Sequence, residues 1–166
     1  MIRKQGTEEN KLGAMTLRHG DCLELMSRIP AGSVDMVLTD IPYDVVSRNS
    51  GGLRNLDKGA ADIKTFSLSA LLSGYGRLAP RSLYIFCATE QVSELRNGLV
   101  GLGYTTRLGV WEKTNPSPMN GQTLWLSGVE CCVFGRIKGA VFNEMRSKTK
   151  VLQKPILSNN PRDFPR

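Results

Sequence analysis

A short apolar run that stops at an acid, a proline and an aromatic ring constrains the fold of this chain more than any other stretch. Residues 34–39 are rich in β-branched and long apolar side chains, which predicts a short buried strand. Asp40, Ile41, Pro42 and Tyr43 follow directly. Pro42 has no N–H group and disfavours helix at Ile41. We therefore expect a stiff loop at the carboxyl end of the strand, the edge at which open α/β sheets bind ligands.

This loop carries the groups needed to bind a planar molecule with an exocyclic amine. The Asp40 carboxylate and a backbone carbonyl can each accept a hydrogen bond from an NH₂ group. The Tyr43 ring can stack on a base, a contact that contributes about 1–3 kcal/mol per base. A binding site for an aromatic amine is thus the first functional hypothesis.

Strand and helix patterns alternate along the chain. We expect strands near residues 15–18, 34–39, 82–88 and 104–111, helices over 22–28, 67–78 and 90–102, and a strand or hairpin over 123–134. Glu130, in the last segment, is interpreted as an exposed residue of the pleat. Because parallel strands need covered faces, the strands from residue 34 to 111 are expected in one sheet flanked by the two longer helices.

The composition excludes several classes of protein. At 166 residues the chain is long enough for one domain with a core. His19 is the only histidine and the four cysteines lack metal-ligand spacing, so neither a metal site nor a Ser-His-Asp triad is expected. Cys87 and Cys132 lie in apolar runs and are interpreted as reduced core thiols. No apolar run reaches the roughly 18 residues of a membrane span and no signal-peptide pattern is seen, which predicts a cytoplasmic protein without a membrane partner.

The sequence Asp40-Ile41-Pro42-Tyr43 resembles the Asp-Pro-Pro-Tyr signature of amino-group DNA methyltransferases, which use S-adenosyl-L-methionine. Segments that resemble other family motifs occur in the right order at residues 20–26, 77–86, 111–113 and 130–134. The resemblance covers about residues 16–143 and is specific in combination. Two features depart from the family: Ile41 replaces the first proline, and no Phe-x-Gly-x-Gly cofactor loop occurs in the sequence.

The resemblance implies an α/β fold, a partial Rossmann-like methyltransferase sheet with flanking helices. It implies that Asp40, Pro42 and Tyr43 are catalytic and that Asp21 and Asp40 lie near S-adenosyl-L-methionine. Asp21 also precedes the helix expected over 22–28, and we weight its role as an N-cap more heavily. An acid at the first signature position favours adenine N6 over cytosine N4 as the methyl acceptor. The target base must flip out of the duplex to be reached.

Three regions are expected: a flexible leader over 1–14, a partial catalytic domain over 15–143, and a basic tail or the start of a DNA-recognition region over 144–166. Family members with this order of segments carry the cofactor loop after the DNA-recognition region. The chain is therefore interpreted as a truncated enzyme, one half of a split enzyme, or a degenerate copy. Besides DNA, the expected partner is a complementary chain or a second copy of this one.

Basic residues concentrate where DNA contacts are expected. The net charge is +7, and from residue 136 onward there are eight basic and two acidic residues. This segment is either a solvated, disordered tail or a segment that binds along the phosphate backbone of DNA, and the two interpretations are compatible. Residues 44–65 are either a functional loop or a disordered insertion. The expected DNA contacts are Arg48, Arg54, Lys113, Asn115, Arg146, Lys148 and Lys150. The resemblance implies those of Lys113 and Asn115, for which a solvated turn is the alternative.

Three classes of function follow from these observations. The leading hypothesis is a site-specific adenine-N6 DNA methyltransferase of the restriction–modification type, or a fragment of one, with N4-cytosine as the alternative target. The second is a catalytically silent DNA-binding module that keeps the fold. The third is a methyltransferase for another planar amide, such as a protein glutamine, where asparagine usually replaces Asp40.

Deletion of residues 146–166 is expected to weaken DNA binding and to flatten its salt dependence, because fewer counterions are released. Fluorescence anisotropy of a labelled duplex, measured over a series of salt concentrations, gives both quantities. An unchanged affinity and slope would exclude a DNA-binding role for the tail.

Overall fold

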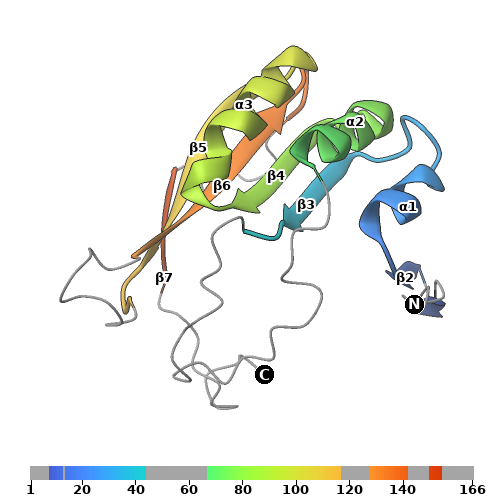
Figure 1. The fold of residues 1–166 in the computed structure, drawn as a ribbon, viewed down its shortest axis with the longest axis horizontal. Coiled ribbons are helices and arrows are strands. Elements are labelled where there is room, and N and C mark those ends of the chain that lie inside the picture. Colours follow the sequence, from blue (N-terminus) through green and yellow to red (C-terminus); the bar gives the residue numbers. More distant parts are fainter. Residues whose placement is uncertain (1–7, 13, 44–66, 117–127, 142–149, 155–166) are drawn as a thin grey trace.

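The computed structural model describes residues 8–12, 14–43, 67–116, 128–141 and 150–154 (Figure 1). In this part of the chain β1 (Glu8–Leu12) and β2 (Met15–His19) form an antiparallel pair. A second sheet contains, in spatial order, β3 (Met36–Asp40), β4 (Ser82–Cys87), β6 (Val129–Arg136), β5 (Thr105–Lys113) and β7 (Val151–Lys154). The helices are α1 (Cys22–Ser27), α2 (Leu68–Leu78) and α3 (Val92–Gly101), and the 3₁₀ turn η2 (Thr89–Gln91) leads into α3.

The larger sheet is mixed. β3 and β4 are parallel, with Asp40 opposite Phe86. β6 runs antiparallel to both β4 and β5, and β7 runs parallel to β5. The carboxyl ends of β3 and β4 therefore meet at one edge of the sheet. The prediction that strands near 34–39, 82–88 and 104–111 share one sheet is confirmed.

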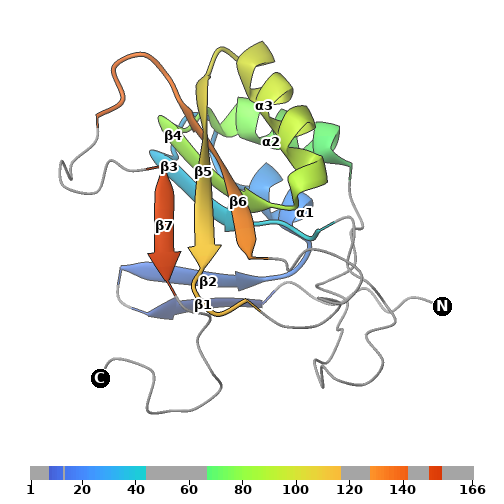
Figure 2. The ribbon, with the colours of Figure 1, turned by 90° about the vertical axis from the view of Figure 1, so that its left-hand side faces the viewer.

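Helices α2 and α3 lie side by side on one face of this sheet (Figures 1 and 2). The core fills the space between the helices and the sheet. Its most deeply buried side chains are Leu83, Ile85, Leu95, Leu99 and Val133. Helix α1 is joined to α2 by Arg77, whose guanidinium donates to the carbonyls of Ile29 (2.8 Å) and Met26.

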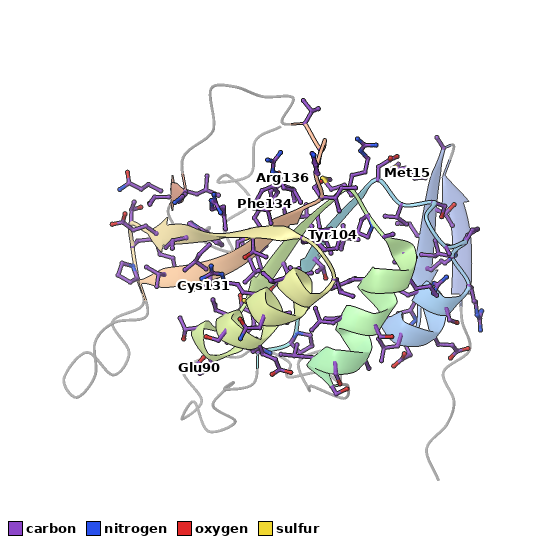
Figure 3. The ribbon with its side chains drawn as sticks, turned by 90° about the horizontal axis from the view of Figure 1, so that it is seen from above. Met15, Glu90, Tyr104, Cys131, Phe134 and Arg136 are labelled. Carbon is purple, nitrogen blue, oxygen red and sulfur yellow. The ribbon has the colours of Figure 1, made fainter. Side chains whose placement is uncertain are left out.

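The opposite face of the sheet carries aromatic and long apolar side chains. Figure 3 shows Phe134 on the side away from α2 and α3, and Cys131 on the side of the helices. The rings of Tyr84 and Phe134 pack with 4.8 Å between their centroids. On β3, Met36 and Leu38 are 54% and 65% exposed. Because β3 is the terminal strand among the described residues, this apolar strip lies at an open edge of the sheet.

Helices occur at the three expected places. The N-termini of α1 and α2 are capped by side chains, whereas α3 begins after the turn η2 without a side-chain cap. Ser67 caps α2 by accepting from the N–H of Ala70 (3.2 Å). The α2 side chains that pack into the core are Leu68, Leu71, Leu72 and Tyr75. Leu102, the C-cap residue of α3, is 40% exposed, and its side chain lies beside Gly76.

Two strands occur where irregular structure was expected. The leader over 1–14 was expected to be flexible, which is wrong for Glu8–Leu12, the strand β1. Val151–Lys154, expected within a basic tail, form β7, and the Lys150 carbonyl accepts from the Val110 N–H (2.7 Å). Both segments are held by backbone hydrogen bonds to a neighbouring strand, which require no apolar pattern. Since a deletion from residue 146 would also remove β7, Lys150→Ala is the variant that tests charge alone.

A close approach of α2 and α3 at Gly98 generates a stability prediction. A Cβ at Gly98 would overlap Leu72 Cδ1, whereas a Cβ at Gly101, in the same helix, would meet no atom within 4 Å. Replacing glycine by alanine inside a helix is favourable by about 1 kcal/mol. At Gly98 the forced shift of the buried Leu72 side chain, typically ~1–3 kcal/mol for overpacking, is expected to outweigh this gain.

Thermal unfolding is therefore expected to show a lower midpoint for Gly98→Ala than for the wild type, and an equal or higher midpoint for the control Gly101→Ala. If both variants are stabilised by the same amount, α2 and α3 are not packed as closely as the structure has them.

Candidate functional site

The loop at the carboxyl end of β3, residues 40–43, is held in place on both sides. The Thr39 hydroxyl, just before the loop, shares a hydrogen bond with the hydroxyl of buried Tyr75 on α2. Ile41 is 4% exposed, and its N–H donates to the Phe86 carbonyl of β4 (3.1 Å). The parallel pairing thus continues one residue beyond β3. A proline at position 41, as in the family signature, could not make this bond because it has no N–H.

A buried glutamine joins the loop to the end of β4. Gln91 is 1% exposed, and its Nε2 donates to the Pro42 carbonyl (3.0 Å). Its Oε1 accepts from the N–H of Ala88 (2.9 Å), which directly follows β4. Sequence reasoning placed Gln91 only at a helix start. A polar residue shortly after a buried strand is the one signal that could have found it, and that signal is shared by most helix starts.

The two polar side chains of the loop interact with each other. The Tyr43 hydroxyl donates to the Asp40 carboxylate. Partial burial removes water from the Asp40 carboxylate and raises its pKa. The hydrogen bond from Tyr43 lowers this pKa, and the negative charge of Glu130 raises it. Partial burial, followed by the charges of Asp40 and Glu130, raises the pKa of Tyr43. At neutral pH Tyr43 is therefore a neutral donor, and Asp40 is an acceptor whose charge is only partly solvated.

An ion pair lies beside these two groups. Lys113 Nζ of β5 is 2.6 Å from Glu130 Oε1 of β6, and the side chains are 14% and 23% exposed. Lys113 Nζ also lies 6.0 Å from the centroid of the Trp111 ring. The interpretation of Glu130 as an exposed pleat residue is therefore wrong. Glu130 lies opposite Trp111 of β5, and its carboxylate is paired with Lys113 of the same strand.

Asp21 occupies the N-cap position of α1, as expected. Its Oδ1 accepts from the N–H groups of Leu23 (2.9 Å) and Glu24 (3.0 Å). Burial, followed by the charge of Asp21, raises the pKa of the adjacent Cys22 thiol.

The residues expected to contact DNA are only partly described. Lys113 is paired with Glu130, while Asn115 and Lys150 have exposed side chains. Arg48, Arg54, Arg146 and Lys148 lie outside the described residues, as does the whole of the expected functional loop over 44–65. The structure thus brings Asp40, Pro42 and Tyr43 together and places Lys113 near them through its partner Glu130.

The site offers hydrogen-bonding groups, with the Asp40 carboxylate as an acceptor and the Tyr43 hydroxyl as a donor. Among the described residues no group of three or more His, Cys, Asp and Glu side chains could hold a metal ion. The four cysteines are free, and burial raises the pKa of Cys87 to about 12 and that of Cys132 to about 11. These two are the inert core thiols expected from the sequence. In the part of the chain that is described, no helix is both long and apolar enough to cross a membrane.

No protein-family model and no curated protein matches the chain, but solved structures do. M1.HpyAVI aligns with a TM-score of 0.56 and 22% identity, over 82% of this chain and 64% of that one. The M1.HpyAVI–SAM complex gives a TM-score of 0.51 and 23% identity, over 74% and 55%. TTHA0409 of Thermus thermophilus, assigned as a DNA modification methylase, gives 0.52 and 16%, over 88% and 68%.

The chain thus spans between about half and two thirds of the length of the matched proteins. At these identities the likeness concerns the fold. The mixed sheet with helices α2 and α3 against it is the Rossmann-like α/β fold of the matched methyltransferase structures, as the resemblance of residues 40–43 to the family signature implied.

Proposed function

We propose that this chain carries the catalytic half of a DNA methyltransferase that transfers a methyl group from S-adenosyl-L-methionine to N6 of a flipped adenine. The observation that carries the proposal is the geometry of residues 40–43. An acid, a buried apolar residue, a proline and a tyrosine follow the strand β3, and each is held by a different neighbour. This loop presents a carboxylate and an aromatic ring at the edge where α/β sheets bind ligands.

The loop solves the main difficulty of methylating an aromatic amine. The lone pair of such an amine is delocalised into the ring, so the nitrogen is a poor nucleophile. If Asp40 and a backbone carbonyl each accept a hydrogen bond from one N–H group of the amine, the nitrogen becomes tetrahedral. Its lone pair is then available to attack the methyl group. Gln91 already donates to the Pro42 carbonyl, so we assign the second acceptor to the Ile41 carbonyl. Asp40 also stabilises the positive charge that develops on nitrogen, and after transfer it can pass the surplus amine proton to solvent.

Tyr43 is proposed to stack on the flipped base while its hydroxyl remains bound to Asp40. A carboxylate accepts several hydrogen bonds, so the Tyr43 bond leaves Asp40 able to accept from the target amine. When bound, S-adenosyl-L-methionine supplies the electrophilic sulfonium methyl. Asp21 fits the cofactor because a carboxylate can cap α1 through Oδ1 and still accept from an amino group.

DNA contacts are proposed for six basic residues and one asparagine. Lys113, Asn115 and Lys150 belong to the described part of the chain, and Arg48, Arg54, Arg146 and Lys148 lie outside it. Lys113 would have to exchange its bond with Glu130 for a phosphate, so its contribution to affinity is expected to be smaller than that of exposed Lys150.

A further polypeptide is proposed to complete the fold, either a complementary chain or a second copy. The matched proteins are longer than this chain. The open edge of β3, with Met36 and Leu38 exposed, is where such a segment could add a strand and bury apolar surface. The glycine-rich cofactor loop that the sequence lacks could come only from a complementary chain, because a second copy lacks it as well.

The second candidate function is a silent DNA-binding module. The missing cofactor loop is the observation that favours it. Calorimetric titration of S-adenosyl-L-methionine into the purified chain, with and without DNA, separates the two. Binding of DNA without any binding of the cofactor, in this chain or in the completed assembly, would support the silent module.

Asp40→Ala is expected to abolish methyl transfer to adenine in DNA while leaving DNA affinity nearly unchanged, because a carboxylate adds no attraction to phosphates. Tyr43→Ala is expected to weaken capture of the flipped base by no more than ~1–3 kcal/mol of stacking. The matched control Tyr43→Phe keeps the ring and should retain most of this capture. Incorporation of labelled methyl groups and fluorescence of a 2-aminopurine at the target position measure the two effects. Equal methylation with alanine at position 40 would refute the mechanism.

The pH dependence provides a separate test. Asp40 must be ionised to accept from the amine, so methyl transfer is expected to fall as the pH drops through the raised pKa of Asp40. Glu130→Gln removes a negative charge that raises this pKa and should shift the acidic limb of the rate profile to lower pH. Glu112→Gln is the control on the neighbouring strand, with no shift expected. A ¹³C NMR titration of the Asp40 carboxyl measures the same pKa without turnover. If Asp40 titrates identically in both variants, the charge of Glu130 does not influence the pKa of Asp40.

A further inference from the structure

Gln91 is an unusual core residue because it is polar and almost fully buried. It is 1% exposed and is among the largest fully buried side chains of the described residues. Burying an amide is unfavourable unless its donor and acceptor are both paired. In Gln91 they are paired, the acceptor with Ala88 and the donor with Pro42. An apolar side chain would fill the same space without this requirement, so the amide specifies a geometry as well as filling the core.

The glutamine side chain is itself held rigidly. Its backbone N–H donates to the Ala88 carbonyl (3.1 Å), while its Oε1 accepts from the Ala88 N–H. These reciprocal bonds close a ring between residues 88 and 91 within the turn η2. The direction of the amide group is thereby fixed relative to the end of β4. Its remaining NH₂ group can then act as a fixed donor toward β3.

The acceptor of that donor is the carbonyl of Pro42, in the middle of the loop. Proline has no N–H, so the carbonyl is its only backbone hydrogen-bonding group. The Gln91 bond therefore fixes the orientation of the Pro42 carbonyl. It does so between the two groups that the proposed reaction uses, the Ile41 carbonyl and the Tyr43 ring. Together with the bond from the Ile41 N–H to Phe86, it holds the loop at two successive residues.

We propose that Gln91 is a positioning residue for methyl transfer, a clamp that sets the orientation of the 40–43 loop by joining the ends of β3 and β4. This inference rests on the proposed function for its effect on catalysis. Its effect on the loop is independent of that function, and the two can be measured separately. Gln91 does not contact the reacting atoms and acts only through Pro42.

The first measurement is amide hydrogen exchange by NMR in Gln91→Met, which keeps side-chain length and burial but loses both amide bonds. Exchange at Ile41 is expected to accelerate by about twofold to tenfold, the equivalent of one neutral hydrogen bond. The exchange rate at Val133, in the core of β6, should rise only as far as the lower free energy of global unfolding of the variant predicts. Gln153→Met is the matched control, because Gln153 also donates through Nε2, to Glu112 (2.8 Å), but lies on the edge strand β7. It should leave Ile41 unchanged.

The second measurement is steady-state transfer of labelled methyl groups to adenine-containing duplex DNA, by the full chain or the completed assembly. Gln91→Met is expected to lower kcat by more than the loss of folded protein, measured by circular dichroism at the assay temperature, and to leave KM for S-adenosyl-L-methionine unchanged. A fall of kcat that only matches the lost folded fraction would indicate a structural role and would overturn the proposal. Unchanged exchange at Ile41 would overturn it as well, whatever the activity.

A second variant covers the case in which Gln91→Met does not fold. Gln91→Glu keeps the acceptor for Ala88, and at alkaline pH its ionised form cannot donate to Pro42. It should accelerate exchange at Ile41 relative to wild type at the same pH, and failure to do so would overturn the clamp. If the wild-type protein transfers no methyl group while either variant accelerates exchange at Ile41, the proposed function fails and the clamp stands.

Discussion

The parallel pairing of β3 with β4 is the constraint on which the candidate site depends. It sets Asp40 beside Phe86 and continues past β3 through the bond from the Ile41 N–H to the Phe86 carbonyl. Because both strands end at the same edge, the segments that follow them are forced to be neighbours. The loop after β3 and the turn after β4 can therefore be joined by a single side chain, that of Gln91.

Ile41 stands where the methyltransferase signature that residues 40–43 resemble has a proline, and this difference has a physical consequence. A proline at position 41 would stiffen the loop by restricting its own backbone. Ile41 gives stiffness by a different route, through a backbone hydrogen bond and a side chain buried in the core. Pro42 keeps the local restriction at the next position. At position 41 the loop is thus held by tertiary contacts, whereas a proline there would restrict it through the fixed φ angle of its ring.

The charges near Asp40 come from strands other than β3 and β4. Asp40 and Tyr43 share a hydrogen bond, and Glu130 adds a negative charge from β6. Lys113 binds Glu130 and partly offsets that charge. The side chains of this pair are mostly buried, so the pair is screened less by solvent than an exposed pair would be. The pKa of the Asp40 carboxyl therefore depends, after its own partial burial and its bond with Tyr43, on a charge carried by β6, a strand distant from it in the sequence.

Local sequence patterns determined the strands near 34–39, 82–88 and 104–111, the buried stripe of α2 and the Asp21 cap, because each depends on neighbouring residues. The sequence also determined that the strand β3 ends at an acid and is followed by a loop with a proline and a tyrosine. Tertiary structure alone decided that Gln91 holds Pro42, 49 residues away, and that Glu130 pairs with Lys113. It also decided that Glu8–Leu12 and Val151–Lys154 are strands. The physical reason is that these features depend on hydrogen bonds and charges between segments that only folding brings together, and such partners leave no periodic pattern in either segment.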